Sequence, residues 1–301
     1  MNFDIAKIEA AITPRTKAIL AVHLHGLPVQ LGPVMALAKR YNLRVIEDCC
    51  QAHGARWDGR KVGTIGDCAA FSFNQNKMLC SGEGGMFVSD DEALFEKAKQ
   101  LWSFGETRTP AESRDYHAYA LGWMYRNNDL TAAFGRAQLA KLDSYLALTA
   151  ENAAALTAGL RDVPGLILPT EPAGCQHNWY NYTIRFTPEV LGDRAQWSER
   201  RYRIVQAFGA EGVPTGVWQQ FILPAMTVFQ AKNAYGKGCP WDCPHSGPVD
   251  YNPALFPEAQ RHCDSHTGMT VPLRAPNGPD IVGHVAKAIA KVMGHLDQLE
   301  D

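Results

Sequence analysis

The chain has 301 residues, 46% hydrophobic and 20% charged, which is an ordinary globular balance and enough for one large domain or two moderate ones. Its 29 basic and 31 acidic residues give a net charge of −2, which argues against a nucleic-acid-binding protein, because such proteins usually carry a basic excess. The sequence contains no apolar run of membrane-spanning length and no signal peptide. Eight cysteines without a secretory signal favour reduced thiols and a cytoplasmic location.

The first third of the chain alternates between strand and helix patterns. Short apolar runs bounded by polar turns predict strands at 17–22, 45–48, 68–73 and 84–89. Periodicity predicts helices at 4–12, 33–41 and 91–102, the last with Asp90 as its N-cap. Strands separated by helices predict a largely parallel sheet, whose ligands are expected in the loops beyond the carboxyl ends of the strands.

The remainder of the chain has a different pattern. Residues 104–128 are polar and aromatic with little periodicity, which predicts a loop, and residues 219–266 are also weakly periodic. The elements expected here are a long helix at 129–161, a strand at 178–186, a helix at 200–212, a short strand at 213–218 and a helix at 277–299. We therefore expect a sheet domain at residues 1–145 and a smaller α+β domain at residues 146–301.

The segment FSFNQNKMLCSGEGG, residues 71–85, places Lys77 between an apolar strand and a glycine-rich turn. A lysine amine can form a Schiff base with an aldehyde, and pyridoxal 5'-phosphate (PLP) is the most familiar aldehyde cofactor. Asp48, at the end of the strand VIED, is suited to keep the ring nitrogen protonated, because an opposite charge favours the protonated form. Ser72 and the small residues of SGEGG suit the phosphate, and Gln51 suits the phenolic oxygen of the ring.

Each of these residues also has a structural explanation. Asp48 can simply cap a helix that follows its strand, and Ser72 can bond to the backbone in the core. Lys77 can be exposed to solvent, as most lysines are, and GEGG can be only a turn. The residues alone therefore leave both interpretations open.

Three blocks, VIEDCCQAHGA, GDCAAFSFNQNK and SGEGG, together with their spacing, resemble the DegT/DnrJ/EryC1/StrS aminotransferases, which act on sugars and cyclitols. The resemblance continues through LGWMYRNNDLTAAFGRAQLAKLD and covers nearly the whole chain. It implies an α/β fold, in which the large domain of PLP-transferase fold type I has a mostly parallel sheet between helices and is incomplete at the N-terminus. The same resemblance implies a smaller C-terminal α+β domain, a homodimer with its active site at the interface, and no metal.

The resemblance also implies roles for individual residues. In that family the lysine of FSF-x3-K forms the Schiff base with PLP, which implies this role for Lys77. The aspartate and glutamine of ED-x2-Q lie against the ring, which implies Asp48 at the pyridine nitrogen and Gln51 beside the ring. The serine of FSF binds the phosphate, which implies Ser72. A related branch has histidine in place of the lysine and dehydrates sugars, so the lysine favours an aminotransferase.

The reaction implied is a ping-pong transamination, in which glutamine or glutamate donates an amino group that passes to a keto-sugar or keto-cyclitol. The blocks FNQNK-x4-GEGG, GWMYR and YGKGCPW look closer to glutamine-using scyllo-inosose aminotransferases than to nucleotide-sugar enzymes. Neither the donor nor the acceptor follows from the sequence. The expected partners are these small molecules and a second copy of the chain, with no nucleic acid and no membrane.

Two features depart from the family pattern. The family often has an asparagine in a G-x-N-x-R block that reaches the phosphate from the second subunit, whereas GWMYR has Met124 there, and Asn127 or Asn128 could substitute. Relatives usually carry a further N-terminal segment with a Gly-Ser/Thr phosphate turn, a stacking aromatic residue and the first strand of the sheet, which are not visible here. The alternative hypothesis is therefore a non-catalytic truncated remnant that binds no cofactor.

The remaining reactive side chains have two interpretations each. Zinc could be held by four ligands drawn from Cys239, Cys243, His245, His262, Cys263 and His266, but the spacing is not usual for a finger or ribbon. We expect a loop with buried thiols near the mouth of the substrate site instead. His23 and His25, in AVHLHG at a strand end, could contact cofactor or substrate, or could be satisfied structural histidines.

Overall fold

A computed structural model of the chain describes residues 2–107, 116–244 and 246–299. The chain forms two compact units. The first contains Met1–Glu151 and Thr170–Asn181, and the second contains Asn152–Pro169 and Tyr182–Asp301. Within the described ranges, every helix is too short or too polar to cross a membrane.

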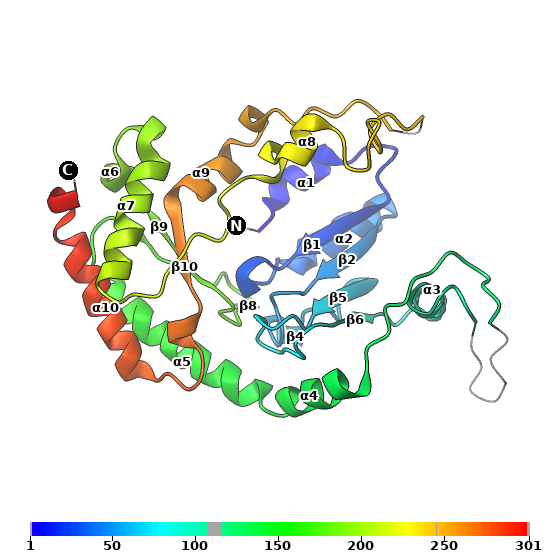
Figure 1. Cartoon of the computed structure of the whole chain (residues 1–301), viewed down its shortest axis with the longest axis horizontal. Helices are drawn as coiled ribbons and strands as arrows, with labels where there is room; N and C mark the ends of the chain where they lie inside the picture. The colour runs from blue at the N-terminus through cyan, green and yellow to red at the C-terminus, as the bar shows by residue number, and fades with distance from the viewer. Residues whose placement is uncertain (1, 108–115, 245, 300–301) are drawn as a thin grey trace. The chain divides into compact units, whose positions relative to one another are not determined.

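A four-stranded sheet with the order β1-β2-β5-β6 forms the centre of the first unit (Figure 1). Its strands are β1 (Ala18–Val22), β2 (Arg44–Asp48), β5 (Cys68–Ser72) and β6 (Gly85–Val88). The first three strands are parallel, and β6 pairs antiparallel with β5. The sequence predicted all four strands, with bounds that differ by one residue at most, and the expected α/β class is confirmed.

Two helices cover the β1–β2 part of this sheet and supply its core. Helix α2 (Leu31–Tyr41) buries its apolar residues at helical spacing and ends at Asn42, whose left-handed backbone lets its N–H bond back to the last turn. Helix α1 (Ile5–Ala11) adds only partly buried isoleucines. The completely buried apolar residues of these strands are Ala21, Val45 and Ala69, and they lie in the same cluster as Leu31 and Val34.

A small second sheet in the first unit has the order β4-β3-β8, with β3 (Arg56–Trp57), β4 (Arg60–Lys61) and β8 (Cys175–Gln176). Strand β8 comes from a segment more than a hundred residues after β3 and pairs antiparallel with it. This pairing returns residues 170–181 to the first unit, close to the loop that follows β2.

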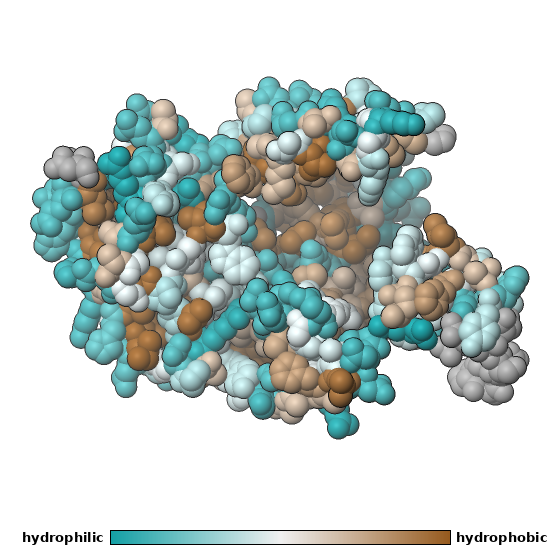
Figure 2. All heavy atoms as spheres, viewed as in Figure 1, coloured by the Kyte–Doolittle hydropathy of each residue, from teal (hydrophilic) through white to brown (hydrophobic). Residues whose placement is uncertain are grey.

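The helices after β6 are exposed. Neither α3 (Glu92–Trp102) nor α4 (Asp129–Leu139) has a buried residue, and apolar residues lie on the surface around α3, at the right of Figure 2. The predicted cap at Asp90 is wrong, because the carboxylate of Asp91 accepts the N–H groups of Ala93 and Leu94. The predicted long helix is also divided, because Lys141 bonds three residues back to Gln138 and so ends α4 before α5 (Leu142–Leu160).

The second unit contains a three-stranded antiparallel sheet, β10-β9-β7. Its elements are β7 (Leu166–Ile167), β9 (Tyr182–Phe186), α6 (Pro188–Leu191), α7 (Trp197–Ala210), α8 (Thr227–Ala231), α9 (Pro257–Ser265), β10 (His266–Met269) and α10 (Pro279–Met293). The short 3-10 helices among the described residues are Leu24–Gly26 in the first unit and Arg194–Gln196, Leu223–Ala225, Pro253–Leu255, Val271–Leu273 and Leu296–Leu299 in the second.

Three sequence predictions for the second unit need correction. The strand expected at 178–186 begins only at Tyr182, because residues 178–181 bond to loops of the first unit. The strand expected at 213–218 is a single bridge between Gly216 and Gly268. Helix α9 lies in the weakly periodic segment and was missed, since its three buried residues include Asp264 and Ser265, which are polar.

Candidate active site

Two neighbouring parallel strands, β2 and β5, end at the same edge of the sheet and carry expected site residues. Asp48 is the last residue of β2 and Ser72 is the last residue of β5. The two strands are directly paired, with Asp48 opposite Ala70. Gln51 and Lys77 lie in the loops that follow these strands, so the structure gathers four of the five predicted cofactor residues around adjoining strand ends.

The carboxylate of Asp48 is half-buried and fixed by its own loop. Its Oδ1 accepts the backbone N–H of Cys50 at 3.0 Å within a turn. The alternative that Asp48 caps a helix is wrong, because residues 49–55 form turns and the next element is a strand. Since an ionised carboxylate can accept about four hydrogen bonds, the contact with Cys50 fixes the orientation of Asp48 and leaves capacity for a further donor.

Gln51 and Ser72 are also held in place by backbone groups. The Oε1 atom of Gln51 accepts the N–H of His25 at 2.6 Å, while its Nε2 makes no hydrogen bond within the described residues. The hydroxyl of Ser72 accepts the N–H of Asn74 at 3.3 Å, which leaves the hydroxyl proton to donate elsewhere. In both side chains, the oxygen is therefore held by a backbone N–H, and a hydrogen-bond donor remains available.

Lys77 is half-buried rather than fully exposed. Its backbone N–H bonds to the carbonyl of Asn74 at 2.9 Å, and its Nζ lies 5.1 Å from the centre of the Tyr180 ring. Burial raises the pKa of the Cys50 thiol to about 11; the Asp48 carboxylate acts in the same direction and the charge of Lys77 opposes it. Asp48 and Lys77 are thus both near enough to the Cys50 thiol to influence its pKa.

A buried histidine lies beside this group. His53 is 2% exposed, and its ring centroid lies 5.6 Å from that of Phe71 and 6.1 Å from that of Phe73. Neither ring nitrogen has a hydrogen-bond partner of good geometry in the described part of the chain. Burial lowers the pKa of His53 to about 4, and the charge of Lys77 acts in the same direction, so this imidazole is neutral at pH 7.

The SGEGG turn requires glycine. Gly82 and Gly84 have φ values of 90° and 151°, and a Cβ on Gly85 would lie 2.8 Å from the carbonyl oxygen of Phe71. A Cβ on Gly82 would meet no atom within 4 Å, so open space adjoins this part of the turn.

The two asparagines proposed as substitutes at the phosphate lie in different settings. Asn128 is the N-cap of α4, where its side chain accepts the N–H of Thr131 at 3.0 Å, so its oxygen is already used locally. The Nδ2 atom of Asn127 would lie 3.3 Å from a Cβ on Gly84, which places Asn127 beside the glycine turn.

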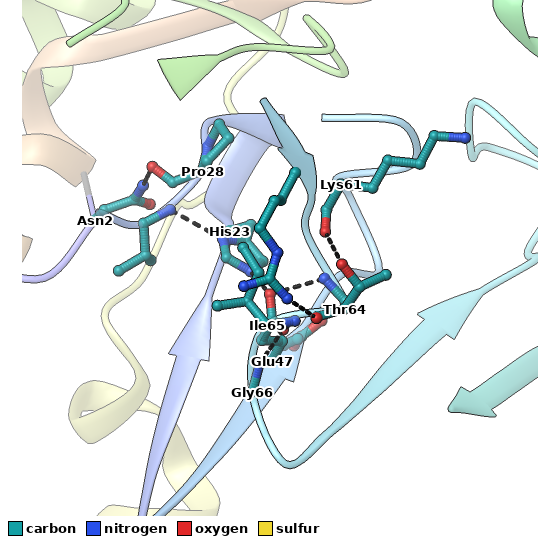
Figure 3. Close-up of polar contacts among 12 residues, drawn as sticks. Asn2, His23, Pro28, Glu47, Lys61, Thr64, Ile65 and Gly66 are labelled. Atoms are coloured by element: carbon teal, nitrogen blue, oxygen red, sulfur yellow. Dashed lines mark hydrogen bonds and ion pairs between the residues drawn. The ribbon is translucent and has the colours of Figure 1, made fainter. Parts of the chain in front are cut away.

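Glu47, which the sequence analysis did not single out, organises the loops on the other side of β2. Its side chain is completely buried, and its two oxygens accept four hydrogen bonds (Figure 3). The donors are the N–H groups of Gly63, Ile65 and Gly66, at 2.7 to 2.8 Å, and Nε2 of His23 at 3.2 Å. Burial alone would raise the pKa of Glu47, but these hydrogen bonds together lower it below its ordinary value.

His23 is a structural histidine, one of the two roles that the sequence left open. Its Nδ1 accepts the N–H of Val29 at 2.9 Å, so its Nε2 carries the proton and donates to Glu47. Among the described residues, the one group of three potential metal ligands is His23, Glu47 and Cys49. Because the oxygens of Glu47 already accept four hydrogen bonds, we interpret this group as a clamp between loops.

The cysteine and histidine residues of the second unit do not form such a group within the described ranges. Cys239 and Cys243 are exposed, which corrects the expectation of buried thiols, whereas Cys263 is buried. His245 lies outside the described residues. His266 is stacked on His262 at 4.1 Å and bonds through Nδ1 to the carbonyl of the same residue.

The sequence analysis also missed Asn178 and Tyr180, which meet the site loops from the returning segment. Asn178 donates to the carbonyls of Gln51 and His53 at 2.9 and 3.1 Å, and Tyr180 faces Lys77. The available signal was the cluster of polar residues in HNWYN, which is unusual for the first half of a buried strand.

The side chains present fit PLP. Lys77 supplies a half-buried amine, Asp48 a fixed carboxylate, and Gln51 and Ser72 supply available donors around adjoining strand ends. The open space beside Gly82 adds room that the described residues do not fill.

Similarity to known proteins agrees with this geometry. The model of the DegT/DnrJ/EryC1/StrS aminotransferase family matches residues 1–245. A protein of Streptoalloteichus tenebrarius named "Putative L-glutamine:3-amino-2,3-dideoxy-scyllo-inosose aminotransferase" is 38% identical over 213 residues, which are 70% of this chain and 49% of that protein. The dTDP-3-amino-3,4,6-trideoxy-alpha-D-glucose transaminase of Streptomyces venezuelae is 35% identical, over 71% of this chain and 52% of the length of that protein. This chain therefore spans about half the length of these curated relatives.

Solved structures give the same result. The aminotransferase from Psychrobacter cryohalolentis is 28% identical and superposes with a TM-score of 0.78, over 98% of this chain and 73% of that one. The 3-amino-5-hydroxybenzoic acid synthase is 26% identical, with a TM-score of 0.82 over 97% of this chain and 71% of that one. The expected fold type I is confirmed by these matches, and the chain belongs to the DegT/DnrJ/EryC1/StrS aminotransferase family.

Proposed function

We propose that this protein is a PLP-dependent aminotransferase that moves an amino group from glutamine or glutamate to a keto-sugar or keto-cyclitol. One observation carries the proposal: the half-buried amine of Lys77 lies in the same site as Asp48, Gln51 and Ser72, on loops after two adjacent strands. PLP, when bound, supplies an aldehyde that takes up the amino group and a ring that withdraws electrons from the reacting carbon.

The roles proposed for the side chains follow from their contacts. Asp48, held by the Cys50 N–H, would accept a hydrogen bond from the protonated ring nitrogen, and Gln51 would donate its amide to the ring oxygen. Ser72 would donate to the phosphate. Lys77 would hold the cofactor covalently, and its Nζ, when free, would remove and return the proton at the substrate carbon. Asn128 would contribute at the phosphate only if it left its cap on α4, so Asn127 has the better position within this chain.

The relatives support a sugar or cyclitol acceptor. Proteins similar to this chain are named for scyllo-inosose, UDP-sugar and dTDP-sugar substrates, and the similar protein of Streptoalloteichus tenebrarius is named for a glutamine donor. We therefore propose glutamine as the donor to test first, with glutamate as the alternative.

We also propose that two copies of the chain associate and that the protein acts in the cytoplasm. Helices α3 and α4, together with residues 103–107 and 116–128 between them, expose large apolar side chains, which a partner surface would cover. The most exposed are Tyr116, Tyr119, Leu121, Tyr125 and Leu130, at 60 to 85%. All eight cysteines are free thiols, which suits a reducing compartment. We keep the proposed division into a large domain at residues 1–145 and a small domain at 146–301; the first compact unit extends to Glu151 and also includes Thr170–Asn181.

An absorbance titration tests the proposal directly. Added PLP should give a visible band that borohydride removes. The reduced cofactor should then remain attached to the peptide that contains Lys77. Lys77→Ala should abolish the band, whereas Lys39→Ala, which changes an exposed lysine on α2, should leave it unchanged. Wild-type protein that stays colourless with excess PLP would support the alternative, a remnant that binds no cofactor.

A further inference from the structure

The segment 177–181 returns to the first unit and is fixed to the loops of the candidate site. The Nδ2 atom of Asn178 bridges the carbonyls of Gln51 and His53, and its backbone N–H bonds to the carbonyl of Gly26 at 3.2 Å. Asn178 is 3% exposed, and a Cβ on Gly26 would lie 1.7 Å from its Oδ1, so this contact is tightly packed.

The backbone of Tyr180 is held on both sides. Its N–H donates to Oδ1 of Asn178 at 2.9 Å, and the next residue, Asn181, bonds through its N–H to the carbonyl of His25 and through its side chain to Nδ1 of the same histidine. The residue before it, Trp179, has a φ of 57°, a left-handed backbone that is rare for a bulky side chain. Such an outlier persists only where the surroundings determine it, and it often marks a functional site.

The ring of Tyr180 meets the lysine loop. It is 1% exposed and packs in a cluster with Met78 and Leu79, the two residues that follow Lys77. The Nζ of Lys77 lies over this ring, 5.1 Å from its centre. A cation at this distance from an aromatic face is attracted to it, more strongly where water is partly excluded.

We infer that Tyr180 is a positioning residue for Lys77: its buried ring holds the free ammonium within the site and keeps it from turning toward solvent. This inference rests on the proposed function for the meaning of the lysine, but the contact itself can be tested without cofactor. A long lysine side chain has many rotamers, so one fixed contact at its end reduces the range that Nζ explores. The amine is then already at the site when the cofactor aldehyde arrives.

Ring-current shifts give the first test. We would label the lysines of the cofactor-free chain by reductive methylation with 13C-formaldehyde and assign the Lys77 signal from its loss in Lys77→Arg. The methyl signals of Lys77 should lie upfield of those of exposed lysines such as Lys39. Tyr180→Phe should keep this upfield shift, because the ring remains, and Tyr180→Leu should remove it. A wild-type Lys77 signal that coincides with the exposed lysines would overturn the inference without any variant.

The rate of covalent loading by PLP gives the second test. Tyr180→Leu should slow the appearance of the visible band by roughly 3- to 10-fold, while Tyr180→Phe should load at nearly the wild-type rate. Equal rates in wild type and Tyr180→Leu, with the band present in both, would contradict the inference but leave the proposed function intact. An upfield Lys77 signal in a protein that PLP never colours would support the contact and contradict the proposed function.

Discussion

Two regions of the first unit are built in opposite ways. Around β2, the carboxylate of Glu47 is completely buried and accepts four hydrogen bonds, and His23 beside it is 1% exposed. Along α3 and α4 no residue is buried, and Trp123 and Leu130, near the start of α4, are 49% and 85% exposed. The geometry around β2 therefore depends on contacts within the chain. The region of α3 and α4, by contrast, presents apolar surface that the rest of the first unit does not cover.

This difference separates two kinds of sensitivity. Substitutions around Glu47 should change the stability of the first unit as a whole, because they leave several buried donors without an acceptor. Substitutions on α3 and α4 should change association or local order and leave the sheet intact.

Glu47→Leu should destabilise the first unit by about 3–5 kcal/mol, because three backbone N–H groups and His23 would remain buried without their shared acceptor. The measurement is the amide hydrogen exchange of β2 across a urea series. Glu151→Leu is the matched control, because Glu151 is an exposed residue of the same unit. This substitution should change the free energy of unfolding by no more than about 0.5 kcal/mol. If Glu47→Leu lowered the free energy of unfolding by less than about 1 kcal/mol, water or rearranged loops would be accepting the hydrogen bonds in place of the carboxylate.

The pH dependence of stability should report His53. Its folded pKa, about 4, lies below the ordinary value of 6.5, so the unfolded chain binds more protons between these values. Stability should therefore be complete above about pH 6.5 and fall by roughly 3 kcal/mol toward pH 4 through this group. His53→Leu should flatten this part of the curve for the first unit without removing all of it, because burial lowers the pKa of His177 in the same direction.

His284→Leu is the control for that pH series, since His284 is exposed and lies in the second unit.

The contribution of Glu47 to stability changes in a lower pH range than that of His53. Its folded pKa is below the ordinary value, so its stabilisation is present above that value and is lost only as the pH falls below it. If His53→Leu left the slope between pH 6.5 and 4 unchanged, the histidine would be charged or hydrated in the folded protein.

The exposed aromatic region should affect association more than folding. Trp123→Ser combined with Leu130→Ser should weaken self-association by at least roughly tenfold and leave the exchange of the β2 amides unchanged. Sedimentation at several protein concentrations measures the first effect. Phe3→Ser, a change at another exposed aromatic residue, should leave association as in wild type. A monomeric wild-type protein at all concentrations would contradict the proposed dimer.

The sequence predicted the parts of the fold that depend on local pattern. All four strands of the main sheet were found, because each is an apolar run between polar turns. The candidate site residues were proposed from their place at or after these strand ends together with the family resemblance, and their roles stay predictions. The cap of α3 and the break between α4 and α5 are local errors, whereas the wrong start of the strand expected at 178–186 comes from distant contacts. Residues 178–181 do not form a strand because Asn178 bonds to carbonyls more than a hundred residues earlier in the sequence.

The part of the site that the sequence missed has the same cause. Glu47 looks like an ordinary polar residue in VIED, and nothing near it in the sequence shows that three N–H groups of the 63–66 loop point at its oxygens. The ring of Tyr180 meets Lys77 only after residues 170–181 return to the first unit. Neighbouring residues determine at the end of which strand a residue lies, but tertiary contacts determine which groups its side chain touches.

The smallest expected effect tests a local error of the sequence prediction. Asp91→Ala should destabilise α3 by about 1 kcal/mol, because the N–H groups of Ala93 and Leu94 would lose their acceptor. Asp90→Ala, at the position first expected to be the cap, should change little. Since α3 has no buried residue to hold it, the loss should appear as faster amide exchange in its first turn, with β2 unaffected. Faster exchange in β2 as well would show that α3 is coupled to the sheet, and the separation between the two regions would then be wrong.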